Sequence, residues 1–101
     1  MSTSTTTTTS HYYSTPGQIL DEEFLQPLGI SRYRLAKAIG VSETAIGEIV
    51  NGKRRITTAM AWRLAKALGT TPDFWSNLQT DYDLLTFDPS DLGDIRPLVT
   101  A

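Results

Sequence analysis

Two short helical patterns separated by a very short turn occupy residues 31–52 and restrict this chain more than any other feature. Ser31 and Ser42 each stand just before one of the patterns. Serine is a good N-cap, because its side-chain oxygen accepts a backbone N–H of the turn that follows. The spacing therefore predicts two capped helices, over about 32–39 and about 43–50.

Apolar side chains repeat at helical spacing in both segments. They are Leu35, Ala36 and Ile39 in the first helix and Ile46, Ile49 and Val50 in the second. Gly40 supplies the unusual backbone angles that so short a turn requires, and Val41 fills its corner. Helices of this length cannot be stable singly in water, so both must pack on further helices. The pattern is that of a helix-turn-helix unit.

Three further helices are predicted around this unit. Thr15-Pro16 opens the first, which Pro27 and Gly29 end, because threonine can cap and proline at the first helical position loses no hydrogen bond. Another helix runs from Thr57 or Thr58 to Leu68, and the last begins at Thr71-Pro72 and reaches about Leu85. With 101 residues and 40% hydrophobic content, the chain is expected to form one compact all-α domain over residues 15–85.

Both ends of the chain differ from the predicted domain. Residues 1–14 are rich in Ser and Thr, lack an apolar run, and are expected to form a flexible tail. Residues 86–101 contain Pro89, Gly93 and Pro97 and are expected to form an irregular tail. We find neither a signal-peptide pattern nor about 18 consecutive apolar residues, so a cytoplasmic protein without a membrane partner is predicted. The absence of cysteine excludes disulfides and thiolate metal sites.

The formal net charge of −2 conceals a strongly basic segment. Residues 32–66 carry eight basic and two acidic side chains, a balance of +6, whereas both flanking segments are acidic. Because the local field attracts a polyanion, the acidic whole does not argue against nucleic-acid binding. A solvated basic face is the simpler explanation, but the basic segment coincides with the helix-turn-helix pattern.

Residues 31–52 resemble the helix-turn-helix of the Cro and phage-repressor type. The resemblance extends to about residues 15–85 through Pro16-Gly17-Gln18-Ile19-Leu20, Ile49-Val50-Asn51-Gly52-Lys53-Arg54-Arg55-Ile56-Thr57, Leu68-Gly69-Thr70-Thr71-Pro72-Asp73-Phe74-Trp75, Leu78-Gln79 and Tyr82-Asp83-Leu84. Together these motifs are similar to those of the HigA-type antitoxins, the antidote components of bacterial toxin-antitoxin pairs. The family usually has His-Pro-Gly-Glu where this chain has Thr15-Pro16-Gly17-Gln18, so roles of that histidine and carboxylate are not carried over.

The resemblance implies a five-helix, lambda-repressor-like DNA-binding domain. It also implies a homodimer that binds a palindromic operator in its own promoter, represses its own operon, and neutralises a partner toxin that cleaves mRNA. These are expectations from the family. Two alternatives remain open: a stand-alone helix-turn-helix transcriptional regulator, and a protein-binding inhibitor whose helix-turn-helix does not bind DNA.

The second helix of such a unit presents its N-terminal residues to base edges in the major groove. Because the apolar stripe of residues 43–50 must face the core, the outward, DNA-contacting positions are expected to be Ser42, Glu43, Thr44, Ala45, Gly47 and Glu48. Thr44 can hydrogen-bond a base edge, and Ala45 can make only an apolar contact with a thymine methyl. Gly47 is explained either by close approach to the sugar-phosphate surface or by packing alone.

This helix lacks the arginine or glutamine that usually makes bidentate base contacts, so affinity must come largely from phosphates. The candidates are Arg32, at the start of the preceding helix, and Lys53, Arg54 and Arg55, in the loop that follows. An ordinary solvated side chain is the competing interpretation for each cation.

Phe74, Trp75, Leu78 and Tyr82 form an apolar stripe on the last helix and are the candidate dimer or partner contacts. At this spacing such a stripe is more often core than interface, and both roles are compatible. Enzyme chemistry, a metal and a cofactor are not expected, because the single histidine, His11, lies in a polar tail and no catalytic cluster is present.

Overall fold

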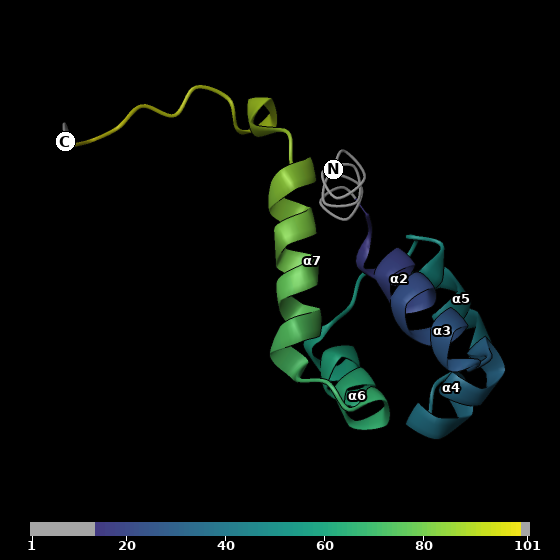
Figure 1. The fold of residues 1–101 in the computed structure, drawn as a ribbon. Helices are drawn as coiled ribbons and strands as arrows, with labels where there is room; N and C mark the ends of the chain where they lie inside the picture. Colours follow the sequence, from purple (N-terminus) through teal and green to yellow (C-terminus); the bar gives the residue numbers. More distant parts are fainter. Residues whose placement is uncertain (1–13, 100–101) are drawn as a thin grey trace, which may run out of the picture.

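The computed structural model describes residues 14–99, so the tail predicted over residues 1–14 lies outside the described residues except for Ser14. Between Pro16 and Thr86 the chain forms helices joined by short connections, and no strand occurs in residues 14–99. The prediction of an all-α domain is therefore confirmed. Figure 1 shows the long C-terminal helix on one side of the helical body and the last residues extending away from it.

The first helix is continuous over three segments, α2 (Pro16–Ile19), the π-helical η1 (Leu20–Leu25) and α3 (Gln26–Leu28). Thr15 begins it with a capping box, in which its side chain accepts from the Gln18 N–H and the Gln18 side chain accepts from the Thr15 N–H. The prediction that Pro27 and Gly29 end this helix is confirmed for Gly29 and wrong for Pro27, which lies within the last turn. A proline has no N–H to leave unpaired, and it follows a widened turn in which the Gln26 N–H bonds five residues back, so the helix ends only at Gly29.

The helix-turn-helix unit consists of α4 (Arg32–Ile39) and α5 (Glu43–Val50), which are the bounds that the sequence predicts. Ser31 and Ser42 cap the two helices, their oxygens accepting N–H groups at 3.0 Å in each case. Gly40 ends α4 in the left-handed region, at φ 73°. The prediction of two capped helices joined through a left-handed glycine is confirmed.

Two longer helices complete the body. The first, α6 (Thr58–Leu68), is capped by Thr57, and the second, α7 (Pro72–Thr86), is capped by Thr71. A 3-10 turn, η2 (Pro89–Leu92), interrupts the segment beyond α7, which the sequence predicts to be irregular throughout.

One hydrophobic core joins η1, α4, α5, α6 and α7. Its fully buried large side chains come from η1, α4, α5, α6 and α7, and they are Leu20, Leu35, Ile46, Ile49, Leu64 and Trp75. Phe24 of η1 packs against Phe74 and Trp75 of α7, with ring centroids 5.9 and 5.1 Å away. Because α5 shares this core on its inner side, its position relative to α2 and α4 is determined by packing.

Helices α2 and α5 lie backbone against backbone at Gly17. A Cβ atom at this position would lie 1.7 Å from the backbone oxygen of Ile49 and 2.9 Å from the Cα of Val50. Real side chains do not tolerate such distances, and the opposing atoms are backbone, which cannot rotate away. Gly17 is therefore required for α2 to lie directly against the C-terminal half of α5.

Gly17→Ala is expected to force α2 and α5 apart and to lower the free energy of unfolding by about 3 kcal/mol or more, the upper end of the overpacking range. Gly47→Ala is the matched control, because its Cβ would have no neighbour closer than 3.7 Å. The control should raise stability by up to about 1 kcal/mol through helix propensity. Urea denaturation measures both, and equal stability of the two variants would contradict the steric argument.

Candidate nucleic-acid interface

The N-terminal end of α5 lies open to solvent. Ser42, Glu43 and Thr44 are exposed, and Gly47 and Glu48 are half-buried on the same helix. The prediction that Ala45 faces outward is wrong, because only 8% of Ala45 is exposed. Ala45 lies four residues before Ile49, on the same side of the helix, so the buried face of α5 includes its methyl group.

Arg32 lies over the outer face of α5. One guanidinium nitrogen, Nη1, is 3.7 Å from the point where a Cβ of Gly47 would stand. The cation of Arg32 thus lies beside the outward positions of α5. Because 3.7 Å is an ordinary contact distance, a methyl group would also fit at this position, and the contact does not require a glycine.

The loop between α5 and α6 carries Lys53, Arg54 and Arg55, all exposed. Arg54 bonds back to α5, where its Nε lies 2.9 Å from Oε1 of Glu48. Glu48 is therefore not a free negative charge facing a phosphate, and Arg54 is not a free positive charge. The pair is neutral as a whole.

Arg55 is paired as well, in this case with α7. Its Nη1 donates to Oδ2 of Asp83 at 2.7 Å, and Oδ1 of Asp83 accepts from Nε2 of Gln79 at 3.0 Å. The Oε1 of Gln79 accepts from the Ile56 N–H at 2.7 Å. Gln79 is 6% exposed and Ile56 is 3% exposed, so this network connects the basic loop to α7 through a buried amide. The sequence analysis missed it, because residues 56 and 79 are joined only by tertiary packing.

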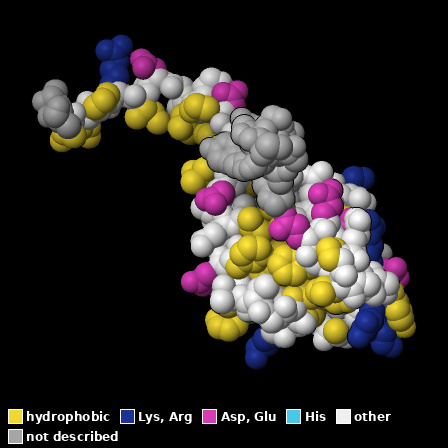
Figure 2. Space-filling view, in the orientation of Figure 1, with side chains coloured by type: hydrophobic (Ala, Val, Ile, Leu, Met, Phe, Trp, Pro, Cys, Tyr) yellow, Lys and Arg dark blue, Asp and Glu magenta, His cyan; other side chains and the backbone are white. Residues whose placement is uncertain are grey.

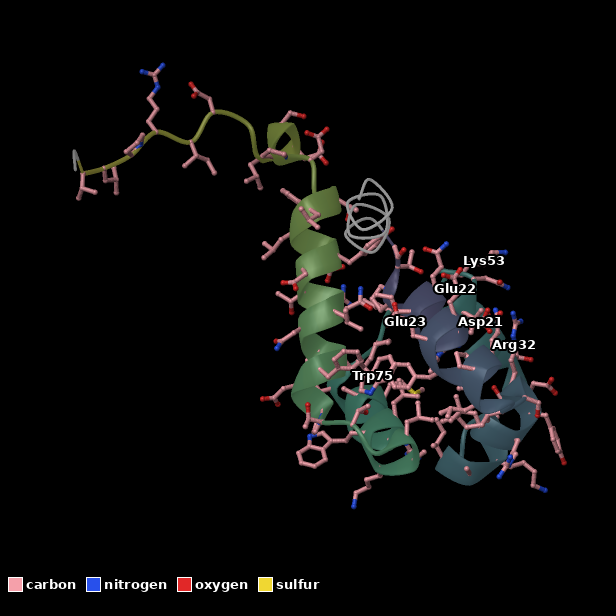
Figure 3. The ribbon with its side chains drawn as sticks, in the orientation of Figure 1. Asp21, Glu22, Glu23, Arg32, Lys53 and Trp75 are labelled. Carbon is pink, nitrogen blue, oxygen red and sulfur yellow. The ribbon has the colours of Figure 1, made fainter. Side chains whose placement is uncertain are left out.

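Lys53 forms no ion pair with any residue from 14 to 99, in contrast to its two neighbours. Arg63, counted in the basic segment, instead donates from Nη1 to the backbone oxygen of Ile39 at the end of α4. In Figure 2 the basic side chains of the helical body gather mainly along the edge formed by α4 and α5, on the side away from α7. Figure 3 places Arg32 and Lys53 on this edge.

The predicted contact stripe on α7 divides into two parts. Trp75 is fully buried, and its indole N–H donates to the Thr70 hydroxyl at 2.7 Å, so its assignment as a dimer or partner contact is wrong. Phe74 and Leu78 are partly buried against the core. Leu78 also lines a groove of about 400 Å³ between α2 and α7, together with Tyr82.

Beyond these positions, α7 and the segment after it expose apolar side chains that the sequence analysis did not select. Leu84 is 74% exposed, and Leu85 and Phe87 are 38% and 53% exposed. Leu84 and Leu85 line the same groove as Tyr82. The sequence pattern that could have identified them is the apolar stripe of α7, which continues beyond Gln79, the last buried residue of this helix.

Residues 14–99 contain no group of three or more His, Cys, Asp or Glu arranged to hold a metal ion. The helices of this range are too short or too polar to cross a membrane. Hydrogen bonds from the side chain and backbone of Ser90 lower the pKa of Asp88, the first acid of the segment after α7.

The sequence of this chain is similar to those of known helix-turn-helix proteins. The family model described as helix-turn-helix matches residues 22–75. Virulence-associated protein I of Dichelobacter nodosus is 45% identical over 87 residues, which cover 84% of this chain and 81% of that protein. Antitoxin HigA-1 of Vibrio cholerae is 44% identical over 68 residues, which cover 67% of this chain and 64% of that protein. Several curated relatives are thus matched over slightly less than two thirds of their length.

Similarity extends to solved structures. The Pseudomonas aeruginosa antitoxin HigA, solved with the higBA promoter, superposes with a TM-score of 0.79 at 37% sequence identity. The match covers 86% of this chain and 99% of that chain. Both the helical body and the sequence that forms it are therefore similar to those of an antitoxin bound to its promoter.

Gln79→Leu is expected to lower the free energy of unfolding by about 1–3 kcal/mol, because the buried Ile56 N–H loses its acceptor. Amide hydrogen exchange at Ile56 should accelerate as well. Thr80→Ala, an exposed change on the same helix, is the control and should alter stability by no more than about 0.5 kcal/mol. If both variants unfold at the same urea concentration and Ile56 exchanges at the wild-type rate, Gln79 does not hold the loop.

Proposed function

Because this chain belongs to the helix-turn-helix family, within the group that contains the HigA antitoxins, we propose that it is a DNA-binding antitoxin. It binds an operator in its own promoter as a homodimer, represses its operon, and neutralises a partner toxin that cleaves mRNA. The chemistry is binding rather than catalysis.

The observation that carries the DNA-binding proposal is the open end of α5 flanked by cations. Thr44 and Glu43 stand exposed at its first turn, Arg32 lies across Gly47, and Lys53 follows in the next loop. This order matches the way a recognition helix contacts bases while the surrounding residues contact phosphates. α5 is also held rigidly, because α2 lies against its backbone at Gly17.

Individual roles follow from exposure and charge. Thr44 reads a base edge, and Ser42 and Glu43 stand beside it at the start of α5. Arg32 and Lys53 neutralise phosphates, as neither forms an ion pair within residues 14–99. Arg54 and Arg55 reach phosphates only in competition with Glu48 and Asp83.

Homodimerisation uses the exposed part of α7 that follows Trp75. Leu78, Tyr82, Leu84 and Leu85 surround the groove between α2 and α7, and this apolar area is available to a second copy. A two-fold dimer would place two α5 helices about one DNA turn, roughly 34 Å, apart.

Toxin neutralisation rests on the family relationship together with the acidic segment after α7. Asp88, Asp91 and Asp94 alternate there with exposed Leu92 and Ile95. Such a segment suits a basic protein partner, since opposite charges steer association and apolar side chains supply buried area.

One specific observation favours a different function, that of a protein-binding inhibitor whose helix-turn-helix does not bind DNA. Two of the three loop cations are paired with acids, and Glu43 is exposed on the recognition face. A stand-alone transcriptional regulator is the other alternative, which shares the DNA-binding part of the proposal.

A gel-shift titration with the promoter upstream of the gene tests DNA binding. We expect salt-sensitive binding, with log K falling linearly with log salt concentration. Absence of any salt-sensitive shift would favour the inhibitor. Co-expression with the product of the adjacent gene then separates the antitoxin from the stand-alone regulator, because only an antitoxin restores growth.

Thr44→Ala is expected to change which operator sequence is preferred, by about 0.5–1.5 kcal/mol at one base pair, because it removes one hydrogen bond to a base. A competition assay with operators that differ at single positions measures this preference. Uniform weakening on every sequence would show that Thr44 does not read a base.

Leu84→Glu is expected to raise the dimer dissociation constant at least about tenfold, because burial of a leucine contributes about 1.5–3 kcal/mol. Analytical ultracentrifugation measures the constant. Leu28→Glu is the matched control, since Leu28 is 58% exposed at the end of α3, away from the groove. A Leu84→Glu protein that dimerises as well as the control would place the dimer contact elsewhere.

A further inference from the structure

We propose that Asp83 on α7 competes with the operator for Arg55 and thereby limits the affinity of this protein for DNA. This inference rests on the proposed DNA-binding function. It assigns to α7, a helix distant in sequence from the helix-turn-helix unit, a direct effect on the basic loop.

Two acids lower the net positive charge of the basic loop. Lys53, Arg54 and Arg55 bring a formal charge of +3, but Glu48 bonds Arg54 and Asp83 bonds Arg55. A phosphate that approaches therefore meets a group whose sum is +1. The gain from releasing counterions depends on this net charge, so each acid removes about one effective phosphate contact.

The backbone of the loop keeps its position without the charge of Asp83. Ile56 is buried, and its N–H is already fixed by Oε1 of Gln79 at 2.7 Å. The carboxylate of Asp83 makes two bonds, one to the guanidinium of Arg55 and one to the side-chain amide of Gln79. A neutral oxygen can accept from Gln79 equally well, so the charge of Asp83 acts on Arg55 and is not needed for the path of the chain.

Arg55 and Asp83 are both accessible to an approaching phosphate. Side chains of Arg55 and Asp83 are 63% and 38% exposed, and an ion pair this exposed is weak in water. A recess of about 190 Å³ opens beside the pair, and Lys53, Arg54, Arg55 and Asp83 all line it. A phosphate oxygen that entered this recess would reach Arg55 while standing close to the carboxylate, which repels it.

Asp83→Asn tests the proposal on the full-length chain with the promoter DNA. The asparagine oxygen can still accept from Gln79, so the buried part of the network is retained. We expect operator binding to tighten about fivefold for each bound protomer at physiological salt. The slope of log K against log salt should become steeper by about 0.9 for each protomer.

Asp73→Asn is the matched control. It removes the same charge from the same helix, but Asp73 is exposed in the first turn of α7, outside the groove between α2 and α7, and forms no ion pair with Arg55. We expect its affinity to stay within about twofold of the wild type, since salt screens the more distant charge. Equal tightening by both substitutions would assign the effect to overall charge and overturn the proposal.

Arg55→Ala separates the remaining interpretations. In that background Asp83→Asn should no longer tighten binding, and a persisting gain would overturn the proposal. Unchanged or weaker binding by Asp83→Asn alone would also overturn it, because Asp83 would then be neutral or would position Arg55 for DNA. Asp83→Ala gives a second measurement if the asparagine variant is unstable by thermal unfolding. A wild-type protein that binds no promoter DNA would refute the proposed function instead, before any variant is compared.

Discussion

The contact of two helix backbones at Gly17 is the constraint on which the arrangement of this protein depends. α2 approaches α5 so closely that even a methyl group would overlap the carbonyl of Ile49. This contact holds the inner side of α5 near its C-terminal end while the N-terminal end stays open. A recognition helix needs both conditions, because its exposed side chains are useful only if their positions are fixed.

Three of the eight basic side chains of residues 32–66 are bonded to other groups of the protein. Arg54 is bonded to Glu48, Arg55 to Asp83, and Arg63 to the end of α4. The basic segment that stands out in the sequence is therefore a set of separate contacts with different tasks. Arg32 and Lys53 are the cations of the proposed interface that no acid of residues 14–99 neutralises.

α7 has an inner and an outer part. Its first turns bury Trp75 and Gln79, which anchor the helix to the core and to the basic loop. Its last turns expose Leu84 and Leu85 beside a groove. α7 therefore takes part in two proposed surfaces. The bonds from Ile56 to Asp83 connect it to the basic loop of the proposed DNA interface, and its last turns belong to the surface proposed for a second copy.

The sequence by itself determined the helices, their caps and the helix-turn-helix unit. These features depend on residues within one turn of each other, such as Ser31 with the Arg34 N–H, so local chemistry predicts them. The inward turn of Ala45, the burial of Trp75 and the pairing of Arg55 with Asp83 were decided only by the tertiary structure. A helical pattern gives the angle of each side chain around the axis of its helix. The exposure and the charge partners of that side chain depend on which other helices pack against that side of the helix.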